Sequence, residues 1–229
     1  MDSLLKSKKG FSLVELLVVI AVLIIILGTA ALTVGTSMRD SGVKKAAFTF
    51  KTMMIDGLKE AMTNYKLVIV ERDTSFGGGT RMMMYIDGDE NHSFGGTNDT
   101  MLAYFVVTGD SVDPGRPAGF TGDYYFVPNV NITASTESGG TTLDLTSLYG
   151  TGFNNVPILS GSYKILIKPE GVYEVLPSKT PGLVLFRNTR DIEEGEQDRQ
   201  YMVLITKTFL RVLKLEDDGS GNYYPRELQ

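Results

Sequence analysis

The sequence predicts an α+β protein, in which one long N-terminal α-helix packs on a head of antiparallel β-strands arranged in one or two sheets. An almost uncharged run extends from Phe11 to Val34. Apolar residues then recur at steps of three and four as far as Tyr65, which is the period of one helix face. From Lys66 onward the apolar runs are short, alternate with a period of two and are bounded by Gly, Asp, Asn and Pro, as strands are.

The run from Phe11 to Val34 is long enough to cross a membrane, since a helix rises about 1.5 Å per residue and a hydrocarbon core is about 30 Å thick. Its one charged residue is Glu15. An ionised carboxylate is unstable in hydrocarbon unless it is neutralised or paired, so Glu15 is a candidate functional residue. No Lys or Arg lies between Phe11 and Met38, and we therefore expect the partner of Glu15 outside this helix.

The start of this run has a specific pattern, in which a basic leader ends at Gly10, the apolar run begins at Phe11 and a glutamate, Glu15, is the fifth residue after the glycine. The pattern resembles the class III signal, or N-methylation motif, of type IV prepilins and type II secretion pseudopilins. The resemblance implies cleavage after Gly10 by a prepilin peptidase and N-methylation of Phe11. It also implies that Glu15 pairs with the N-terminal amine of a neighbouring subunit, an arrangement in which two buried charges offset each other.

The same resemblance implies where the chain resides and what it meets. The N-terminus would be cytoplasmic, one helix would cross the inner membrane, and the head would lie in the periplasm or outside before the subunit enters a filament. The expected partners are the prepilin peptidase, other pilin or pseudopilin subunits and the inner-membrane assembly platform. The expected domains are a removed leader, a transmembrane and filament-core helix, its amphipathic continuation and a β-rich head, at residues 1–10, 11–35, 36–65 and 66–229.

Two other interpretations of the N-terminal segment stay open. An ordinary secretory signal peptide has an apolar core of roughly 7 to 15 residues, with the cleavage site after it, whereas here the run is longer and Gly10 precedes it. A signal-anchored periplasmic protein would be held by Lys6, Lys8 and Lys9 under the positive-inside rule, but that interpretation leaves Glu15 unexplained.

The composition argues against nucleic-acid binding and thiol chemistry. The net charge is −5, and it becomes −7 if residues 1–10, with three lysines and one aspartate, are removed. An acidic head is a poor nucleic-acid binder, and without cysteine there is neither a disulfide nor a thiolate site. The alternative of a DNA-binding minor pilin for uptake has one candidate cluster, diluted by the acids at 216–218: Lys207, Phe209, Arg211, Lys214, Tyr223, Tyr224 and Arg226.

The period of the apolar residues predicts one helix from Phe11 to about Tyr65. Its outer half would pack on the head through one stripe: Val43, Ala47, Phe50, Met54, Leu58, Met62 and Tyr65. Met53, Met54 and Met62 are expected to fill the contact between helix and sheet rather than to form a peptide-binding groove. Four glycines weaken the helix locally, namely Gly28, Gly35, Gly42 and Gly57.

The head is expected to contain antiparallel strands joined by hairpins. Strands are predicted at residues 66–70, 81–86, 102–107, 124–127, 163–168, 172–175, 183–187 and 201–215. The last run is long enough for two strands or for one bent strand, with the bend at residues 206–210. The Gly-rich connections between strands are predicted to be exposed loops, because none follows a strand and opens a helix as a phosphate-binding loop does.

One acidic segment has spacing similar to that of a calcium loop. Asp87, Asp89 and Asn91 place oxygen ligands at alternate positions, but His92 stands where the loop glycine is expected and Asn98 stands near the position of the bidentate glutamate. A tight acidic hairpin turn is therefore favoured over a calcium site, and no cofactor is expected.

No catalytic group stands out, and we do not expect an enzyme. His92 is the only histidine, so a histidine-based metal cluster is impossible, and it falls in a turn where we expect it to be solvated. The mixed charges of residues 190–199 indicate an exposed loop, and residues 216–222 indicate a flexible terminus capped by Asp217 and Asp218.

Three segments of the head, residues 85–91, 165–171 and 202–212, resemble general secretion protein H and fimbrial protein T. Those minor subunits place two β-sheets after the helix. Their usual Thr-Gly-Arg turn appears here as Thr208-Phe209-Leu210-Arg211, without the glycine. These resemblances imply a structural, minor subunit of a type IV pilus or a type II secretion pseudopilus.

Overall fold

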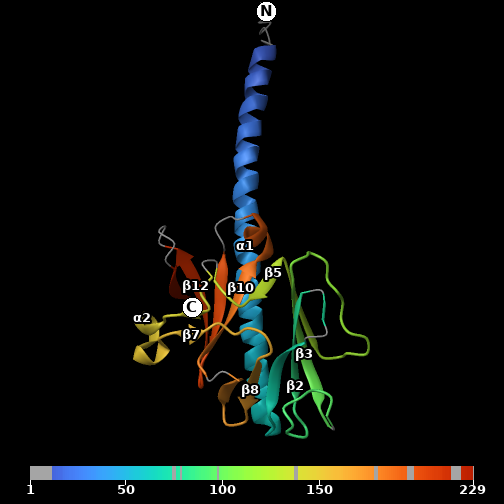
Figure 1. Ribbon diagram of the computed structural model, residues 1–229. Helices are drawn as coiled ribbons and strands as arrows, with labels where there is room; N and C mark the ends of the chain where they lie inside the picture. Colours follow the sequence, from blue (N-terminus) through green and yellow to red (C-terminus); the bar gives the residue numbers. More distant parts are fainter. Residues whose placement is uncertain are drawn as a thin grey trace, which may run out of the picture. The chain divides into compact units, whose positions relative to one another are not determined.

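The computed structural model describes residues 12–73, 76–77, 79–96, 98–136, 139–177, 180–194, 199–217 and 223–228. The chain forms two compact units, Met1–Met38 and Arg39–Gln229. The boundary between the units falls within helix α1, which spans Leu13–Asn64 and is labelled in Figure 1. The predicted helix is therefore present almost to its predicted end.

The first unit contains the apolar part of α1. The large apolar side chains that the structure describes between Leu13 and Leu27 are exposed, with 44% to 74% of their surface accessible. By length and composition this helix could cross a membrane. An apolar helix whose side chains are not buried by the rest of its own chain is stable only when lipid or other protein surrounds it.

The second unit contains a first sheet of six strands in the order β4-β3-β2-β1-β8-β9. Their bounds are β1 Val68–Asp73, β2 Thr80–Ile86, β3 Thr100–Thr108, β4 Asp123–Pro128, β8 Lys164–Lys168 and β9 Val172–Leu176. Neighbouring strands pair antiparallel except β3 and β4, which are parallel. The predicted antiparallel pairing is therefore confirmed for this sheet except at β3 and β4, where the connection at residues 109–122 is long enough to return the chain to the same end of the sheet.

A second sheet of five strands has the order β13-β12-β11-β10-β5. Its strands are β5 Val130–Thr133, β10 Gly182–Asn188, β11 Gln200–Ile205, β12 Leu210–Asp217 and β13 Tyr223–Leu228. A small sheet pairs β6 Thr142–Leu143 with β7 Val156–Pro157. Short helices are α2 Thr146–Tyr149, η1 Thr151–Phe153 and α3 Thr189–Glu194. The run at 201–215 thus forms two strands that meet at the predicted bend.

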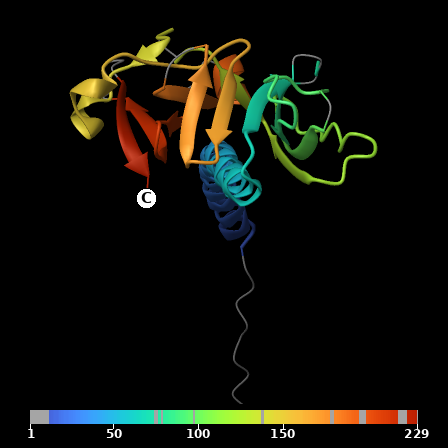
Figure 2. The same ribbon diagram turned by 90° about the horizontal axis from the view of Figure 1, so that it is seen from below.

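The main core lies between both sheets and the part of α1 that belongs to the second unit. Figure 2 shows the strands of the two sheets on one side of that part of the helix. Phe50 of α1 meets Phe105 of the first sheet at 5.5 Å between ring centroids and Phe186 of the second sheet at 5.8 Å. These contacts fasten one helix to two sheets, and they confirm the predicted α+β fold with two main sheets.

The predicted apolar stripe of α1 is confirmed over most of its length but not at its end. Val43, Ala47, Phe50 and Met54 are fully buried, and Leu58 packs against the core. Met53 is fully buried as well, so the adjacent Met53 and Met54 fill the contact between helix and sheets, as expected. Met62 and Tyr65 are exposed at 52% and 85%, so their predicted place in the stripe is wrong.

The exposure of Tyr65 follows from how the helix ends. Tyr65 has φ 53°, in the left-handed region, and the Lys66 amide donates to the Ala61 carbonyl at 3.3 Å. This is the hydrogen bond of a Schellman ending, which turns the chain away from the helix before Tyr65 could reach the sheet.

Three predictions about the loops are corrected by the structure. The acidic connection at residues 87–99 joins the antiparallel strands β2 and β3 and is a long loop rather than a tight turn. Residues 189–194 form helix α3, in which Asp191 is buried, rather than an exposed loop. The C-terminal residues 223–228 form edge strand β13 rather than a flexible tail, and Asp218 lies outside the described residues.

Candidate functional site

The first turn of α1 holds Glu15 through a reciprocal pair of hydrogen bonds with Ser12. The Ser12 amide donates to Glu15 Oε2 at 2.9 Å, and the Glu15 amide donates to Ser12 Oγ at 3.2 Å. This is a capping box, in which each side chain satisfies an amide that the helix leaves open. Glu15 therefore has a local partner within its own helix. The predicted partner on a neighbouring subunit stays a prediction. The spacing Ser-x-x-Glu was present in the sequence as a signal for it.

Gly10 and Phe11, the predicted cleavage and methylation positions, lie outside the described residues. Beyond Glu15, the hydroxyls of the apolar segment are satisfied within the helix. Thr29 Oγ1 donates to the Ile26 carbonyl at 2.9 Å, and Thr33 Oγ1 donates to the Thr29 carbonyl at 3.0 Å. These bonds hide polar groups from an apolar environment. Glu15 thus remains the one formal charge between Phe11 and Met38.

The second unit begins with an ion-pair network centred on Asp191. Its carboxylate, fully buried, accepts from Arg39 Nη1 at 3.1 Å and from Arg199 Nη1 at 2.8 Å. Asn188 Oδ1 accepts from the amides of Arg190 and Asp191, which fixes the start of α3. The network joins α1 to α3 and to the start of β11, and sequence reasoning missed it because alternating charges usually indicate a solvated loop.

A second polar contact to α1 lies beside this network. Tyr201 donates to the Asp40 carboxylate, with its hydroxyl oxygen 2.9 Å from both carboxylate oxygens. Lys214 Nζ lies 3.7 Å from Asp40 Oδ1. Burial and the hydrogen bond to Asp40 raise the pKa of Tyr201 well above its ordinary value. Arg39 and Asp40 are therefore both held by the head, on successive residues of the helix.

The loop at residues 87–99 brings three carboxylates together. Asp87, Asp89 and Asp99 each place one carboxylate oxygen within 4.8 Å of the other two. The predicted ligand Asn91 is not in this group. Its side-chain amide donates to Asp89 Oδ2 at 2.8 Å, and its Oδ1 accepts from the Ser93 amide at 2.7 Å. Asp99 was not predicted as a ligand, because the spacing of a calcium loop places the last ligand at residue 98, which is an asparagine.

The backbone of this loop is wrapped tightly around the carboxylates. Asp99 Oδ1 accepts from the Gly88 amide at 2.9 Å, and Asp99 Oδ2 accepts from the amides of Gly95 and Gly96 at 3.0 and 2.8 Å. A Cβ atom at Gly96 would collide with the Asp89 carboxylate, so a side chain there would require Asp89 to move. Hydrogen bonds from three amides hold Asp99 in position toward the other two acids.

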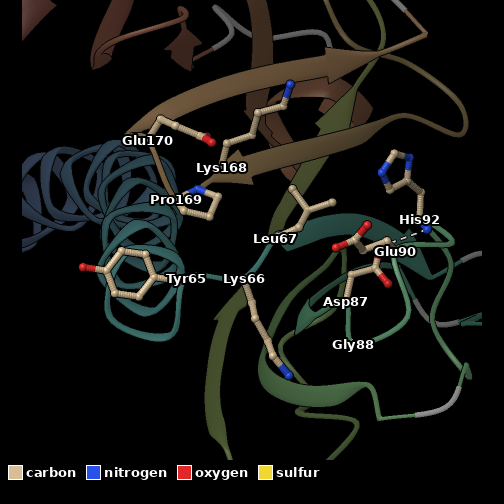
Figure 3. A pocket seen from close by; sticks show the side chains of 10 residues that line it. All are labelled: Tyr65, Lys66, Leu67, Asp87, Gly88, Glu90, His92, Lys168, Pro169 and Glu170. Carbon is tan, nitrogen blue, oxygen red and sulfur yellow. Dashed lines mark hydrogen bonds between the residues drawn. The ribbon is translucent and has the colours of Figure 1, made fainter.

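A pocket of about 470 Å³ adjoins the loop. Figure 3 shows Asp87, Glu90 and His92 on one side of it, with Lys168 at the end of β8 and Pro169 and Glu170 of the following turn on another. The His92 side chain is exposed, as predicted, and its amide donates to Asp87 Oδ2 at 2.9 Å. The pocket gives solvent a route to the edge of the loop.

The candidate nucleic-acid cluster is largely neutralised. Arg211 pairs with Glu227 at 2.7 Å and Arg226 with Glu216 at 3.6 Å, while Lys214 faces Asp40. Phe209 is half-buried beside the rings of Tyr149 and Phe153. A nucleic-acid surface needs cations and aromatic faces that are open to the ligand, and the described part of the cluster offers few of either.

Comparison with known families matches residues 5–31 to the prokaryotic N-terminal methylation motif. This is the class III prepilin signal found in the type IV pilin and pseudopilin superfamily. Comparison of the chain with curated proteins and with solved structures finds no match. The family resemblance predicted for the N-terminal segment is therefore confirmed at the level of the motif.

Proposed function

We propose that this pilin-like protein, which carries the prepilin signal, is a structural subunit of a type IV pilus or a type II secretion pseudopilus. The observation that supports the proposal most strongly is the juxtaposition of two features in α1. Its first part is apolar and exposed, with a single carboxylate in its first turn, and its last part is packed into a β-rich head. A helix of this kind can lie in lipid before assembly and against sibling helices after it.

In this proposal residues 11–35 first cross the inner membrane, with the N-terminus in the cytoplasm and the head in the periplasm or outside. A prepilin peptidase cuts after Gly10, and the new amine of Phe11 is methylated. The assembly platform then extracts the helix from the membrane into a bundle of subunits. The methylation motif at residues 5–31 supports this sequence of events.

Glu15 would set the register of assembly. In the correct stagger its carboxylate meets the N-terminal amine of a neighbouring subunit, and in other staggers the charge stays bare in an apolar surrounding. The capping box supports this role because, among the described residues, the Ser12 amide engages one carboxylate oxygen, Oε2. A carboxylate oxygen has two lone pairs, so the group can hold its own helix end and still receive a second donor.

We also propose that the chain is a minor subunit similar to general secretion protein H and fimbrial protein T. The arrangement of two main sheets after the helix supports this assignment, since those subunits share it. The proposed role is structural, and the head would be displayed on the filament rather than perform catalysis.

The function is tested by replacing Glu15 and following two separate quantities, insertion into the membrane and incorporation into sheared filaments. Glu15→Ala and Glu15→Gln should insert normally, because each makes the helix less polar. Filament incorporation should fall by about tenfold or more, because the neighbour's amine would lose its partner. Val14→Ala, at the adjacent apolar position, is the matched control and should assemble normally. Normal incorporation of both Glu15 variants would contradict the proposal.

A further inference from the structure

The loop at residues 87–99 contains an unusual concentration of negative charge for so small a space. Asp87 and Asp89 follow β2, Asp99 precedes β3, and one carboxylate oxygen from each lies within 4.8 Å of the others. Like charges at this distance repel, and the repulsion is weakened least where water is excluded. No Lys or Arg in the described part of the chain forms an ion pair with Asp87 or Asp99.

Asp87 supplies a second, independent observation. Only 2% of its surface is exposed, and its Oδ2 accepts from the His92 amide across the loop. Its Oδ1 is buried and has no hydrogen-bond partner among the residues that the structure describes. A buried carboxylate oxygen without a donor is costly, and such a group calls for a cation.

The carboxyl group of Asp87 is directed into the loop rather than toward the body of the head. The bond to His92 holds one oxygen at the loop backbone, and an oxygen of the same carboxylate lies within 4.8 Å of those of Asp89 and Asp99. The other two acids are fixed by amides, Asp99 by Gly88, Gly95 and Gly96 and Asp89 by Asn91. The oxygens are therefore preorganised before any ion arrives.

We propose that Asp87, Asp89 and Asp99 bind one Ca²⁺ ion in this loop. The ligand set consists of oxygen alone, which suits a hard cation rather than zinc or copper. Ca²⁺ accepts about six to eight oxygen ligands in irregular geometry, so loop carbonyls or water can complete its shell, whereas Mg²⁺ demands a near-octahedral arrangement. An irregular loop of this length suits the larger ion.

The proposed ion would stabilise the connection between β2 and β3 and with it one end of the first sheet. It would cancel the repulsion among three acids and satisfy the unpartnered oxygen of Asp87. The adjoining pocket, which Asp87, Glu90 and His92 help to line, gives a hydrated ion access to the loop (Figure 3). This inference does not depend on the filament role of the chain.

The test uses the purified full-length chain in mild detergent, stripped with EGTA and then titrated with CaCl₂ or MgCl₂ in calorimetry and in thermal melts. The wild-type chain should bind one Ca²⁺ and melt at a higher temperature with it, and Mg²⁺ should give a smaller shift. Asp87→Asn and Asp99→Asn should each weaken Ca²⁺ binding by about tenfold or more, since each removes a charged ligand. Glu170→Gln, at an exposed acid that lines the same pocket, is the matched control and should bind as the wild type does.

Asp87→Asn also separates a lost ligand from a lost fold. In EGTA this variant should melt at or above the wild-type temperature, because it relieves the repulsion without removing volume. In CaCl₂ only the wild type should gain stability. The proposal is overturned if the wild type shows neither heat nor a melting shift in millimolar Ca²⁺, if Mg²⁺ acts as strongly as Ca²⁺, or if both Asn variants keep the wild-type response.

Discussion

Arg39 Nη1 lies 3.1 Å from Asp191 Oδ1, although the two residues are 152 positions apart in the chain. Asp191 also pairs with Arg199, and its side chain is fully buried. Removing one member of a buried ion pair costs about 3 to 5 kcal/mol, and we expect about 2 to 3 kcal/mol for Asp191→Ala because both arginines keep some contact with water.

This cost corresponds to a melting temperature lower by roughly 5 to 10 °C for a unit of this size. The measurement is thermal unfolding of the full chain in detergent, followed by near-ultraviolet circular dichroism. Arg190→Ala, at an exposed neighbour on the same short helix, should change the temperature little. If Asp191→Ala and Arg190→Ala lowered the melting temperature equally, the ion pairs of Asp191 would not contribute specifically to stability.

Because the pKa of Tyr201 is raised by folding, the free energy of unfolding of the head should fall at alkaline pH. Its pKa is raised in the folded chain by burial and by the hydrogen bond to Asp40, so the unfolded chain loses this proton first. The contribution of Tyr201 to the free energy of unfolding is fully present below a pH of about 10, the ordinary tyrosine pKa. Between that pH and the pKa in the folded chain, the contribution falls by about 1.4 kcal/mol per pH unit.

Tyr201→Phe should therefore flatten the loss of stability between pH 10 and 11, measured as the difference in melting temperature at the two values. Tyr85, Tyr124, Tyr149, Tyr163 and Tyr173 also have raised pKa values, so the wild-type slope is a sum and only the difference between variants is informative. Tyr65→Phe, at an exposed site, is the control. An unchanged slope for Tyr201→Phe would refute this assignment.

Gly57 and Gly42 both lie in α1, but their surroundings predict opposite effects of alanine. A Cβ at Gly57 would lie 2.7 Å from Met84 Sδ and 2.9 Å from Ile167 Cδ1, whereas nothing lies within 4 Å of one at Gly42. Gly42→Ala should add up to about 1 kcal/mol through helix propensity. Gly57→Ala should lose about 1 kcal/mol, since overpacking of about 1 to 3 kcal/mol exceeds that gain. Thermal melts in detergent measure both effects. If both alanine variants were stabilised equally, Met84 and Ile167 would be able to move aside without cost.

Ser12 should matter for assembly through Glu15. Ser12→Ala removes the Oγ that accepts from the Glu15 amide and weakens the first turn by about 0.5 to 2 kcal/mol. We expect filament incorporation lower than in wild type but higher than in Glu15→Ala, because the carboxylate remains. Ser12→Thr keeps the hydroxyl and should restore incorporation. The readout is the ratio of sheared to membrane-bound protein. If Ser12→Ala were incorporated as well as the wild type, the capping box would not contribute to assembly.

The strands that the sequence predicted are those whose apolar residues lie inside the head. Val68, Phe105 and Val184, for example, are fully buried, so burial imposed the period of two on their strands. Strand β13 was missed because Pro225 and the polar residues before it favour a loose tail. It is an edge strand, where a proline costs least. Strand direction was missed at β3 and β4 because alternation of side chains is the same in parallel and antiparallel pairs.

The candidate sites divide in the same way. Glu15 could be found from its neighbours in sequence, because a charge within an apolar run is a local anomaly. Asp191 and Asp99 could not, since each acquires its partners only when distant segments meet: Arg39 reaches α3, and β3 returns beside β2. The third acid of the loop thus depends on strand pairing, which a template of fixed spacing does not contain.

The most direct test of the filament role is N-terminal mass spectrometry of the protein recovered from sheared filaments. We expect a chain that begins at methylated Phe11, and in a strain without prepilin peptidase a chain that retains residues 1–10 and stays in the membrane. A filament-borne chain that retains residues 1–10 while the peptidase is active would contradict the account.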